Sequence, residues 1–142
     1  MCKALKVYSS IILFLLTIIS CNKVNPQLQI KHINGYWEIE KVILSDGNVK
    51  EYGFNSIIDF FEIKDTTGIR KKIQPRFNEK YVISGKGEQF SVNLAKENIQ
   101  LHYKTSLTSW KETIITLKEN KMVIKNEAGN VYFYRRHQKI KL

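Results

Sequence analysis

The chain is poor in cysteine and proline, with 2 of each in 142 residues. Two cysteines cannot build the disulfide framework of a small secreted domain, and they exclude a metal site made of four cysteines. Glycine is too sparse for a collagen-like chain, and apolar residues, at 43%, are too frequent for a disordered one. The composition therefore predicts one globular domain of ordinary size.

Recognisable catalytic and metal-binding patterns are also missing. The sequence contains no Gly-x-Ser-x-Gly and no His-Glu-x-x-His. The three histidines, His32, His102 and His137, stand far apart, and none has a neighbouring cysteine. We therefore expect no metal site, no cofactor and no enzymatic activity.

Positive charge is in excess: 23 Lys and Arg stand against 13 Asp and Glu, for a net charge of +10. Only 4 of the basic residues are Arg, which argues against dedicated phosphate recognition because the guanidinium fork suits phosphate best. We expect no nucleic-acid partner. Basic clusters at 70–72, Arg76 and 135–141 are either solvated surface or contacts to anionic lipid headgroups.

Residues 1–20 have the layout of a secretory signal peptide. Lys3 and Lys6 form a basic start, and an uncharged run follows with its most apolar stretch at 11–19. Polar residues enter this run before Lys23, so it is too short for a permanent transmembrane helix, which needs about 20 apolar residues. We expect the leader to be cleaved, which lowers the net charge from +10 to +8 because it holds two lysines and no acid.

The leader ends in Ile18-Ile19-Ser20-Cys21, which resembles the bacterial lipobox. The resemblance implies that Cys21 carries diacylglycerol and a fatty acyl group such as palmitate, and that residues 21–32 tether the domain to a membrane. Several acyl chains anchor firmly, at about 0.8 kcal/mol per buried CH2. The alternatives are ordinary cleavage after Ser20 or an uncleaved signal anchor, with Cys21 free. Asn22 is not the Asp that often retains lipoproteins in the inner membrane, which favours the outer membrane, facing the periplasm.

From Ile33 onward, apolar residues recur mainly at every second position, as is typical of strands with one buried face. Strands are expected at 35–44, 56–64, 69–74, 79–84, 89–96, 98–106, 110–118, 121–126 and 131–136. Turn-forming residues stand at 45–48, 65–68, 85–87, 118–121 and 126–130. We interpret Gly85-Lys86-Gly87 as a hairpin turn, because it lacks the spacing and the following helix of a phosphate-binding loop.

Such short connections make neighbouring strands antiparallel, and no helical stripe interrupts them. We therefore predict an all-β domain over residues 33–142, an antiparallel up-and-down meander barrel of eight or nine strands. A two-sheet β-sandwich is the alternative. The barrel is favoured because closure removes the edge strands at which a chain rich in Val, Ile, Phe and Tyr would aggregate.

The first predicted strand opens with Gly35-Tyr36-Trp37, and the last ends in Arg135-Arg136. Over residues 33–136 this plan resembles that of bacterial lipoproteins with a lipocalin-like domain, in which the Trp closes one end of the barrel beneath a basic side chain. The resemblance implies structural roles for Gly35 and Trp37, and makes either Arg135 or Arg136 the basic partner. A guanidinium stacked on an indole is worth about 0.5 to 2 kcal/mol.

The lipocalin resemblance also implies a non-enzymatic protein that binds a small hydrophobic ligand inside its barrel. The candidate lining residues are Trp37, Phe61, Phe90 and Tyr103. The full set of side chains that we predict to point inward is Trp37, Ile39, Phe61, Ile63, Phe90, Val92, Leu94, Leu101, Tyr103, Ile115 and Phe133. The alternative is a solid-core barrel that acts on another envelope protein, as an inhibitor, an interaction partner or a structural lipoprotein.

Asp59 is a carboxylate inside an apolar run, between Ile58 and Phe60. If it points inward, burial raises its pKa and makes it a candidate site residue. In the other register Asp59 lies in water and Glu62 points inward instead. The alternation of apolar residues does not choose between the two registers, and we interpret both acids as structural.

Overall fold

A computed structural model describes residues 29–76, 80–94 and 98–138. The strands, in chain order, are β1 (Gly35–Ile43), β2 (Val49–Glu51), β3 (Ile58–Lys64), β4 (Thr67–Pro75), β5 (Tyr81–Asn93), β6 (Ile99–Lys104), β7 (Ser109–Lys118), β8 (Lys121–Asn126) and β9 (Val131–Arg136). A 3-10 helix, η2 (Lys31–Ile33), precedes β1.

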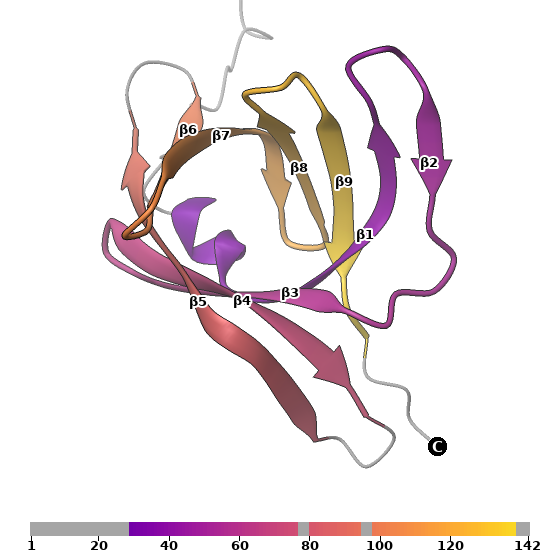
Figure 1. The fold of residues 1–142 in the computed structure, drawn as a ribbon, viewed down its shortest axis with the longest axis horizontal. Helices are drawn as coiled ribbons and strands as arrows, with labels where there is room; N and C mark the ends of the chain where they lie inside the picture. Colours follow the sequence, from indigo (N-terminus) through magenta and orange to yellow (C-terminus); the bar gives the residue numbers. More distant parts are fainter. Residues whose placement is uncertain (1–28, 77–79, 95–97, 139–142) are drawn as a thin grey trace, which may run out of the picture.

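All strand pairs are antiparallel, and β1 pairs with both β3 and β9, so that eight strands close into a barrel (Figure 1). The ninth strand, β2, stands outside the ring. It pairs with the last three residues of β1, so that Val49 lies opposite Ile43. The predicted all-β meander barrel is thus confirmed. β2 was not predicted, because its three residues are all exposed and carry no apolar alternation.

One end of the barrel is closed by η2, which lies within the ring of strands in Figure 1. Ile30 and Ile33 are buried in the core cluster, so packed structure begins before residue 33. The opposite end carries the β1–β2, β6–β7 and β8–β9 turns, and the first and last of these are joined because Asn130 Oδ1 accepts a hydrogen bond from the Ser45 amide at 2.9 Å. Within the part of the chain that the structure describes, no helix is long and apolar enough to cross a bilayer.

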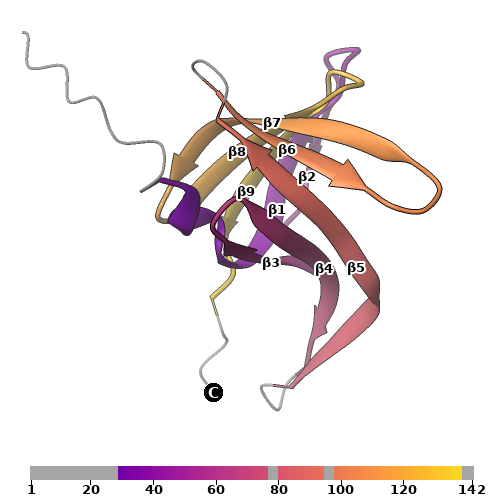
Figure 2. The ribbon, with the colours of Figure 1, turned by 90° about the vertical axis from the view of Figure 1, so that its left-hand side faces the viewer.

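The Gly85-Lys86-Gly87 segment is not a turn, contrary to our prediction. β5 runs through it as one strand that stays paired with β4, and the register shifts between Arg70 and Lys72. Gly85 and Gly87 both have φ near +80°, a conformation that glycine adopts without strain. The two glycines therefore allow an irregularity inside a long hairpin, which projects from the barrel in Figure 2.

Two residues of the predicted inward set lie elsewhere. Ile115 is 53% exposed, because a register shift between Ile114 and Thr116 reverses the alternation and turns Ile114 inward. Phe133 lies outside the core cluster, beneath the Lys41 ammonium, which is 4.6 Å from its ring centroid. The other nine belong to the core or pack against it: Trp37, Ile39, Phe61, Ile63, Phe90, Val92, Leu94, Leu101 and Tyr103.

Candidate functional site: the barrel interior and its mouth

Trp37 occupies the closed end of the barrel and is fully buried. Its indole N–H donates a hydrogen bond to the Ile33 carbonyl at 2.8 Å, which ties β1 to η2. The Arg136 guanidinium lies 3.9 Å from the indole centroid. A side chain on Gly35 would collide with this guanidinium, since a Cβ there would stand 2.6 Å from Arg136 Nη1.

Arg136, and not Arg135, is the basic partner of the indole. Its guanidinium donates hydrogen bonds to the Glu119 and His32 carbonyls, each at 2.6 Å, and to the Asn34 carbonyl. Burial lowers the pKa of Arg136 from its usual value. Arg135 points the other way and pairs with Glu38 at 2.6 Å, and this hydrogen bond raises its pKa.

The four predicted lining residues, Trp37, Phe61, Phe90 and Tyr103, are each at most 4% exposed. Three of them form a chain of ring contacts, with centroids 6.2 Å apart for Phe61 and Phe90 and 5.4 Å apart for Phe90 and Tyr103. These rings therefore fill the lower barrel rather than line an open cavity there.

A buried ion-pair cluster crosses the interior above these rings. Arg70 of β4 is 8% exposed, and its guanidinium contacts Glu112 of β7 at 3.1 Å and Glu88 of β5 at 2.7 Å. Burial acts to lower the pKa of Arg70, but the acidic groups around it, Tyr103, Glu112 and Asp59, outweigh burial and raise that pKa above its ordinary value. Arg70 is thus a fixed internal cation and not part of the basic surface cluster at 70–72.

The position of Arg70 could not be found from the sequence. It stands next to Lys71 and Lys72 in the basic cluster at 70–72, which we expected on the surface. A charged residue in this place gives no signal in a single sequence, because its partner Glu112 lies 42 residues away.

Asp59 points inward and is 2% exposed, which selects between the two registers left open by the sequence. Lys72 Nζ lies 2.5 Å from Asp59 Oδ1, and the Tyr134 hydroxyl donates to Oδ2 at 3.2 Å. Burial, and then the Asp59 charge, raise the pKa of Tyr134. Asp59 is therefore held by two partners, and Glu62 is exposed.

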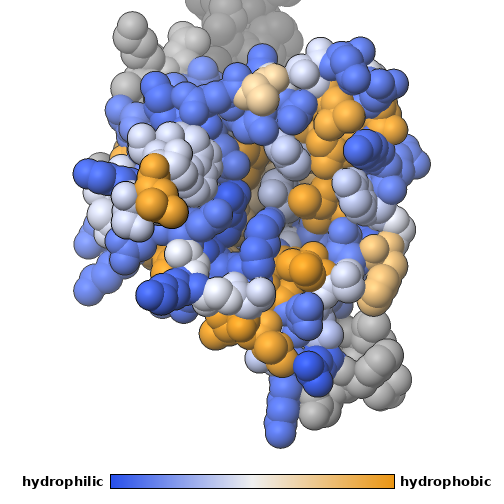
Figure 3. All heavy atoms as spheres, in the orientation of Figure 1, coloured by the Kyte–Doolittle hydropathy of each residue, from blue (hydrophilic) through white to orange (hydrophobic). Residues whose placement is uncertain are grey.

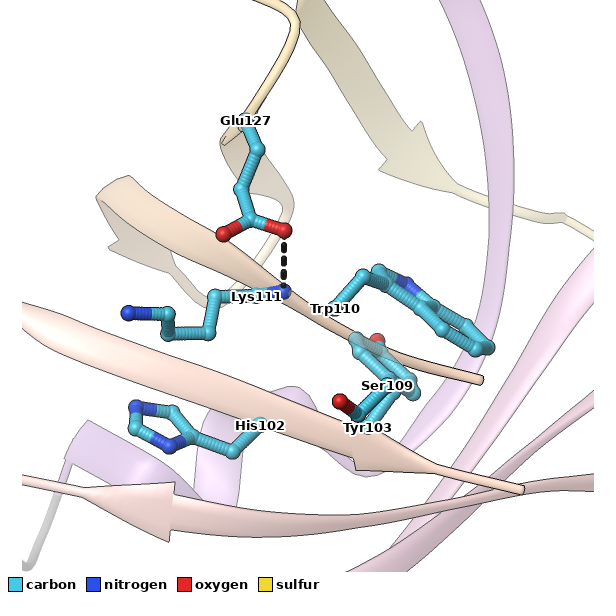
Figure 4. Close-up of a pocket in the computed structure, with 6 residues that line it drawn as sticks. All are labelled: His102, Tyr103, Ser109, Trp110, Lys111 and Glu127. Carbon is cyan, nitrogen blue, oxygen red and sulfur yellow. Dashed lines mark hydrogen bonds between the residues drawn. The ribbon is translucent and has the colours of Figure 1, made fainter. Parts of the chain in front are cut away.

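A pocket of about 270 Å³ opens at the barrel mouth, where β7 extends beyond the end of β8 (Figure 4). Its lining residues are His102, Tyr103, Ser109, Trp110, Lys111 and Glu127. In Figure 4, Trp110, Ser109 and Tyr103 lie on one side, and the side chains of His102 and Lys111 on the other. Glu127, from the β8–β9 turn, accepts a hydrogen bond from the Lys111 amide at 3.1 Å.

The inner wall of this mouth pocket is aromatic. The rings of Tyr103 and Trp110 are stacked, with centroids 4.9 Å apart and planes 6° apart. Tyr103 also contacts the Arg70 guanidinium, 4.6 Å from its centroid. Its hydroxyl lies beside Glu112 but makes no hydrogen bond of acceptable geometry, and burial raises its pKa. Of the predicted lining residues, only Tyr103 reaches the pocket.

Trp110, Glu127 and His102 were missed as site residues by the sequence analysis. Trp110 is the first residue of the strand predicted at 110–118, and a single aromatic residue there is as compatible with core packing as with binding. In the described residues, no group of three or more His, Cys, Asp or Glu side chains gathers closely enough to hold a metal ion.

A family model described as a lipocalin-like domain matches residues 33–124, from η2 into β8. Among solved structures, the chain is similar to a lipocalin-like protein from Bacteroides uniformis, at 10% identity and a TM-score of 0.48, over 75% of this chain and 99% of that one. An uncharacterized protein from Bacteroides eggerthii matches at 14% identity and 0.48, over 73% and 98% of the two chains. Lobster apocrustacyanin A1 matches at 8% identity and 0.45, over 78% and 64%. No curated protein matches the chain.

Proposed function

Because this chain belongs to the lipocalin-like domain family, we propose that it is a non-enzymatic lipoprotein of the bacterial envelope that binds a small ligand at the mouth of its barrel. Lipocalin-like barrels are in general binding proteins. The observation that carries the proposal is the mouth pocket, which combines an aromatic wall with hydrogen-bonding groups at its rim.

The ligand sits at the mouth in this proposal and not in the depth of the barrel. The interior below Tyr103 is filled by Phe90, Phe61 and Trp37, and above them by the Arg70 cluster. A ligand in that volume would have to displace packed rings or buried ions, each at a cost of several kcal/mol. The mouth pocket needs no such displacement.

Anchoring through Cys21 supplies the localisation part of the proposal. The lipobox resemblance, the basic start of residues 1–20 and the absence of another cysteine in the mature chain support it. All of these positions lie outside the described residues. We propose the outer membrane, facing the periplasm, with the acyl chains on Cys21 as the membrane contact.

Native mass spectrometry on residues 22–142, which include every described strand, tests ligand binding. We expect a co-purified mass, or one acquired after incubation with an envelope extract, that is lost when Ser109→Trp fills the mouth pocket. A clean apo mass under both conditions would overturn the binding function.

Anchoring has a separate test in the full chain. Cys21→Ser should move the protein from the membrane fraction to the soluble fraction after expression in a bacterium that acylates lipoproteins. Cys2→Ser, within the leader, is the matched control and should leave the distribution unchanged. Persistence of the Cys21→Ser protein in membranes would contradict acylation at this residue.

A second candidate function is binding of another envelope protein through the outer surface. It is favoured by the filled interior together with three large apolar side chains exposed on the β2–β3 connection, Tyr52 at 38%, Phe54 at 81% and Ile57 at 46%. On the face seen in Figure 3, apolar groups are interspersed with polar ones and form no single broad patch. Small-ligand binding therefore stands first.

A further inference from the structure

The mouth pocket is built around a column of stacked groups. The Arg70 guanidinium lies 4.6 Å from the Tyr103 centroid, and the Trp110 ring lies 4.9 Å from it and almost parallel. Arg70 is itself held by Glu112 and Glu88. The column therefore begins at a cation fixed inside the barrel and ends at the Trp110 indole in the pocket wall.

This column holds the indole in a defined orientation. Tyr103 is 1% exposed, so it has little freedom to rotate, and it covers part of the Trp110 surface. Trp110 is only partly buried and lines the pocket. A rigid, pre-oriented aromatic surface loses little entropy when a second flat ring stacks on it.

The size of the pocket restricts what it admits. A volume of about 270 Å³ lies just below the usual range for small-molecule sites, roughly 300 to 1,000 Å³. One or two fused rings fit such a volume, whereas a long acyl chain does not fit in full. The packed rings of Phe90 and Phe61 leave such a chain no path further down the barrel.

The polar rim carries both signs of charge. Lys111 and Glu127 both line it, with His102 beside them, whose Nε2 lies 3.2 Å from Gln100 Oε1. At the inner wall, the Tyr103 hydroxyl is buried without a hydrogen bond. One cationic and one anionic side chain together do not select a strongly charged ligand, but the rim offers hydrogen bonds to a polar substituent.

We propose that the mouth pocket selects flat aromatic or heteroaromatic molecules of one or two rings, which stack on Trp110 as the next member of the Arg70–Tyr103–Trp110 column. This inference rests on the proposed ligand-binding function and narrows its ligand class. Trp110 is the specificity-determining residue, and the rim residues bind a hydroxyl, amino or carbonyl substituent on the ring.

Two probes with the same carbon count and the same hydroxyl separate stacking from simple apolar burial. 2-Naphthol is flat and aromatic, and 1-decanol is a flexible chain with more apolar surface. If burial of apolar area alone decides, 1-decanol binds more tightly. If stacking on Trp110 decides, 2-naphthol binds at least tenfold more tightly.

Nitrogen-15 NMR on residues 22–142 reads out the two tryptophans separately. The Trp110 indole N–H signal should shift on titration with 2-naphthol. The Trp37 signal is an internal control and should stay in place, because its N–H is buried and donates to Ile33 at the closed end. Affinities follow from the shift against probe concentration.

Variants of Trp110 test whether its ring is the reason that 2-naphthol binds more tightly than 1-decanol. Trp110→Phe keeps an aromatic face, and its affinity for 2-naphthol should stay within about threefold of the parent. Trp110→Leu keeps an apolar side chain without that face, and its affinity should fall at least tenfold. Both affinities are followed through the His102 amide signal. Leu107→Ala, on the same hairpin and 94% exposed, should change nothing. If Trp110→Leu fails to fold, Ser109→Phe fills the pocket without removing a core contact and should also lose at least tenfold.

Three results would overturn the inference: equal or tighter binding of 1-decanol, undiminished 2-naphthol binding in Trp110→Leu or Ser109→Phe, or no 2-naphthol shift at Trp110. Binding of 1-decanol in the pocket would leave the proposed ligand-binding function standing and remove only the aromatic class. If neither probe shifts any signal and native mass spectrometry gives a clean apo mass, both the aromatic ligand class and the proposed ligand-binding function are overturned.

Discussion

Trp37 joins three parts of the chain at the closed end of the barrel. It lies on β1, donates to η2 through Ile33, and carries the guanidinium of Arg136 from β9 on its ring. Arg136 in turn donates to carbonyls of η2 and of the β7–β8 turn. Removal of one ring therefore affects the closure of the whole end.

Trp37→Ala should lower the free energy of unfolding by about 3 to 5 kcal/mol, because it deletes a fully buried indole and leaves a cavity. Urea denaturation of residues 22–142, followed by circular dichroism, measures the change. Leu107→Ala is the matched control and should stay within about 0.5 kcal/mol, since Leu107 is 94% exposed. A loss below about 1 kcal/mol for Trp37→Ala would contradict its role as a core residue.

At this scale the sequence predicted residue types better than residue orientations. Gly35 and Trp37 were identified from a short motif, but the choice between Arg135 and Arg136 depends on which way β9 faces. Each of 131–134 is apolar or aromatic, so both faces of that strand are equally plausible from the sequence. Pairing with β1 settles the choice, because it sets Arg136 opposite Trp37.

A single irregularity in β7 decides which isoleucine is part of the core. Ile114 is 4% exposed and Ile115 is 53% exposed. The register shift between Ile114 and Thr116 adds one residue to the strand, so the inward positions become Glu112, Ile114 and Leu117. Strict period-two alternation has no means of showing where such a residue is inserted.

The two neighbours provide a direct comparison. Ile114→Ala should cost about 2 to 4 kcal/mol of stability because it opens a cavity in the core, whereas Ile115→Ala should cost less than about 0.5 kcal/mol. Thermal and urea unfolding of both variants measure the difference. A loss for Ile115→Ala as large as that for Ile114→Ala would contradict the inward position of Ile114 and the outward position of Ile115.

The ion pair between Arg70 and Glu112 connects β4 to β7 across the barrel interior. Each partner is 8% exposed, so removing one leaves the other charged and poorly solvated. Arg70→Met should therefore cost about 3 to 5 kcal/mol, and Glu112→Leu a similar amount. The double variant Arg70→Met, Glu112→Leu should lose clearly less than the sum.

A double-mutant cycle by urea denaturation measures that coupling, which we expect at about 1 to 3 kcal/mol. Glu88→Gln serves as a control and should change the stability little, because the Glu88 side chain is 36% exposed and retains access to water. Strictly additive losses in the double variant would show that Arg70 and Glu112 do not stabilise each other.

For the whole molecule, the buried phenols make stability depend on alkaline pH. Burial raises the pKa of Tyr103 and of Tyr134, whereas an unfolded tyrosine ionises near pH 10. Above about pH 10 the unfolded chain therefore binds fewer protons than the folded barrel. The stabilisation is fully present below that pH and is lost as pH rises, by about 1.4 kcal/mol per pH unit for each of the two residues.

Urea denaturation between pH 9 and 11 measures this loss, with tyrosinate absorbance as the second signal. Tyr134→Phe should flatten the dependence by about 1.4 kcal/mol per pH unit, and the difference from the parent cancels the contribution of the lysines. Ionisation of Tyr103 and Tyr134 near pH 10 in the folded state would contradict the prediction.

The barrel as a whole could be predicted because its determinants are local. Alternation defined most strands, and the turns at 45–48, 118–121 and 126–130 were marked by Gly, Asn and Asp. The site could not be predicted in the same way. Trp110 and Glu127 line the same pocket because β7 extends beyond the end of β8. A difference in strand length of this kind is set by pairing partners rather than by local composition.

The ring of strands is completed by β1 and β9, which brings Glu38 against Arg135, 97 positions later in the chain. Contacts of such high sequence separation form slowly, since the intervening chain must first be brought together. Synthesis also delivers β9 after every other strand. The ring of strands therefore cannot close until β9 is available, so for a chain exported as proposed the barrel closes only after the last strand has left the translocation pore.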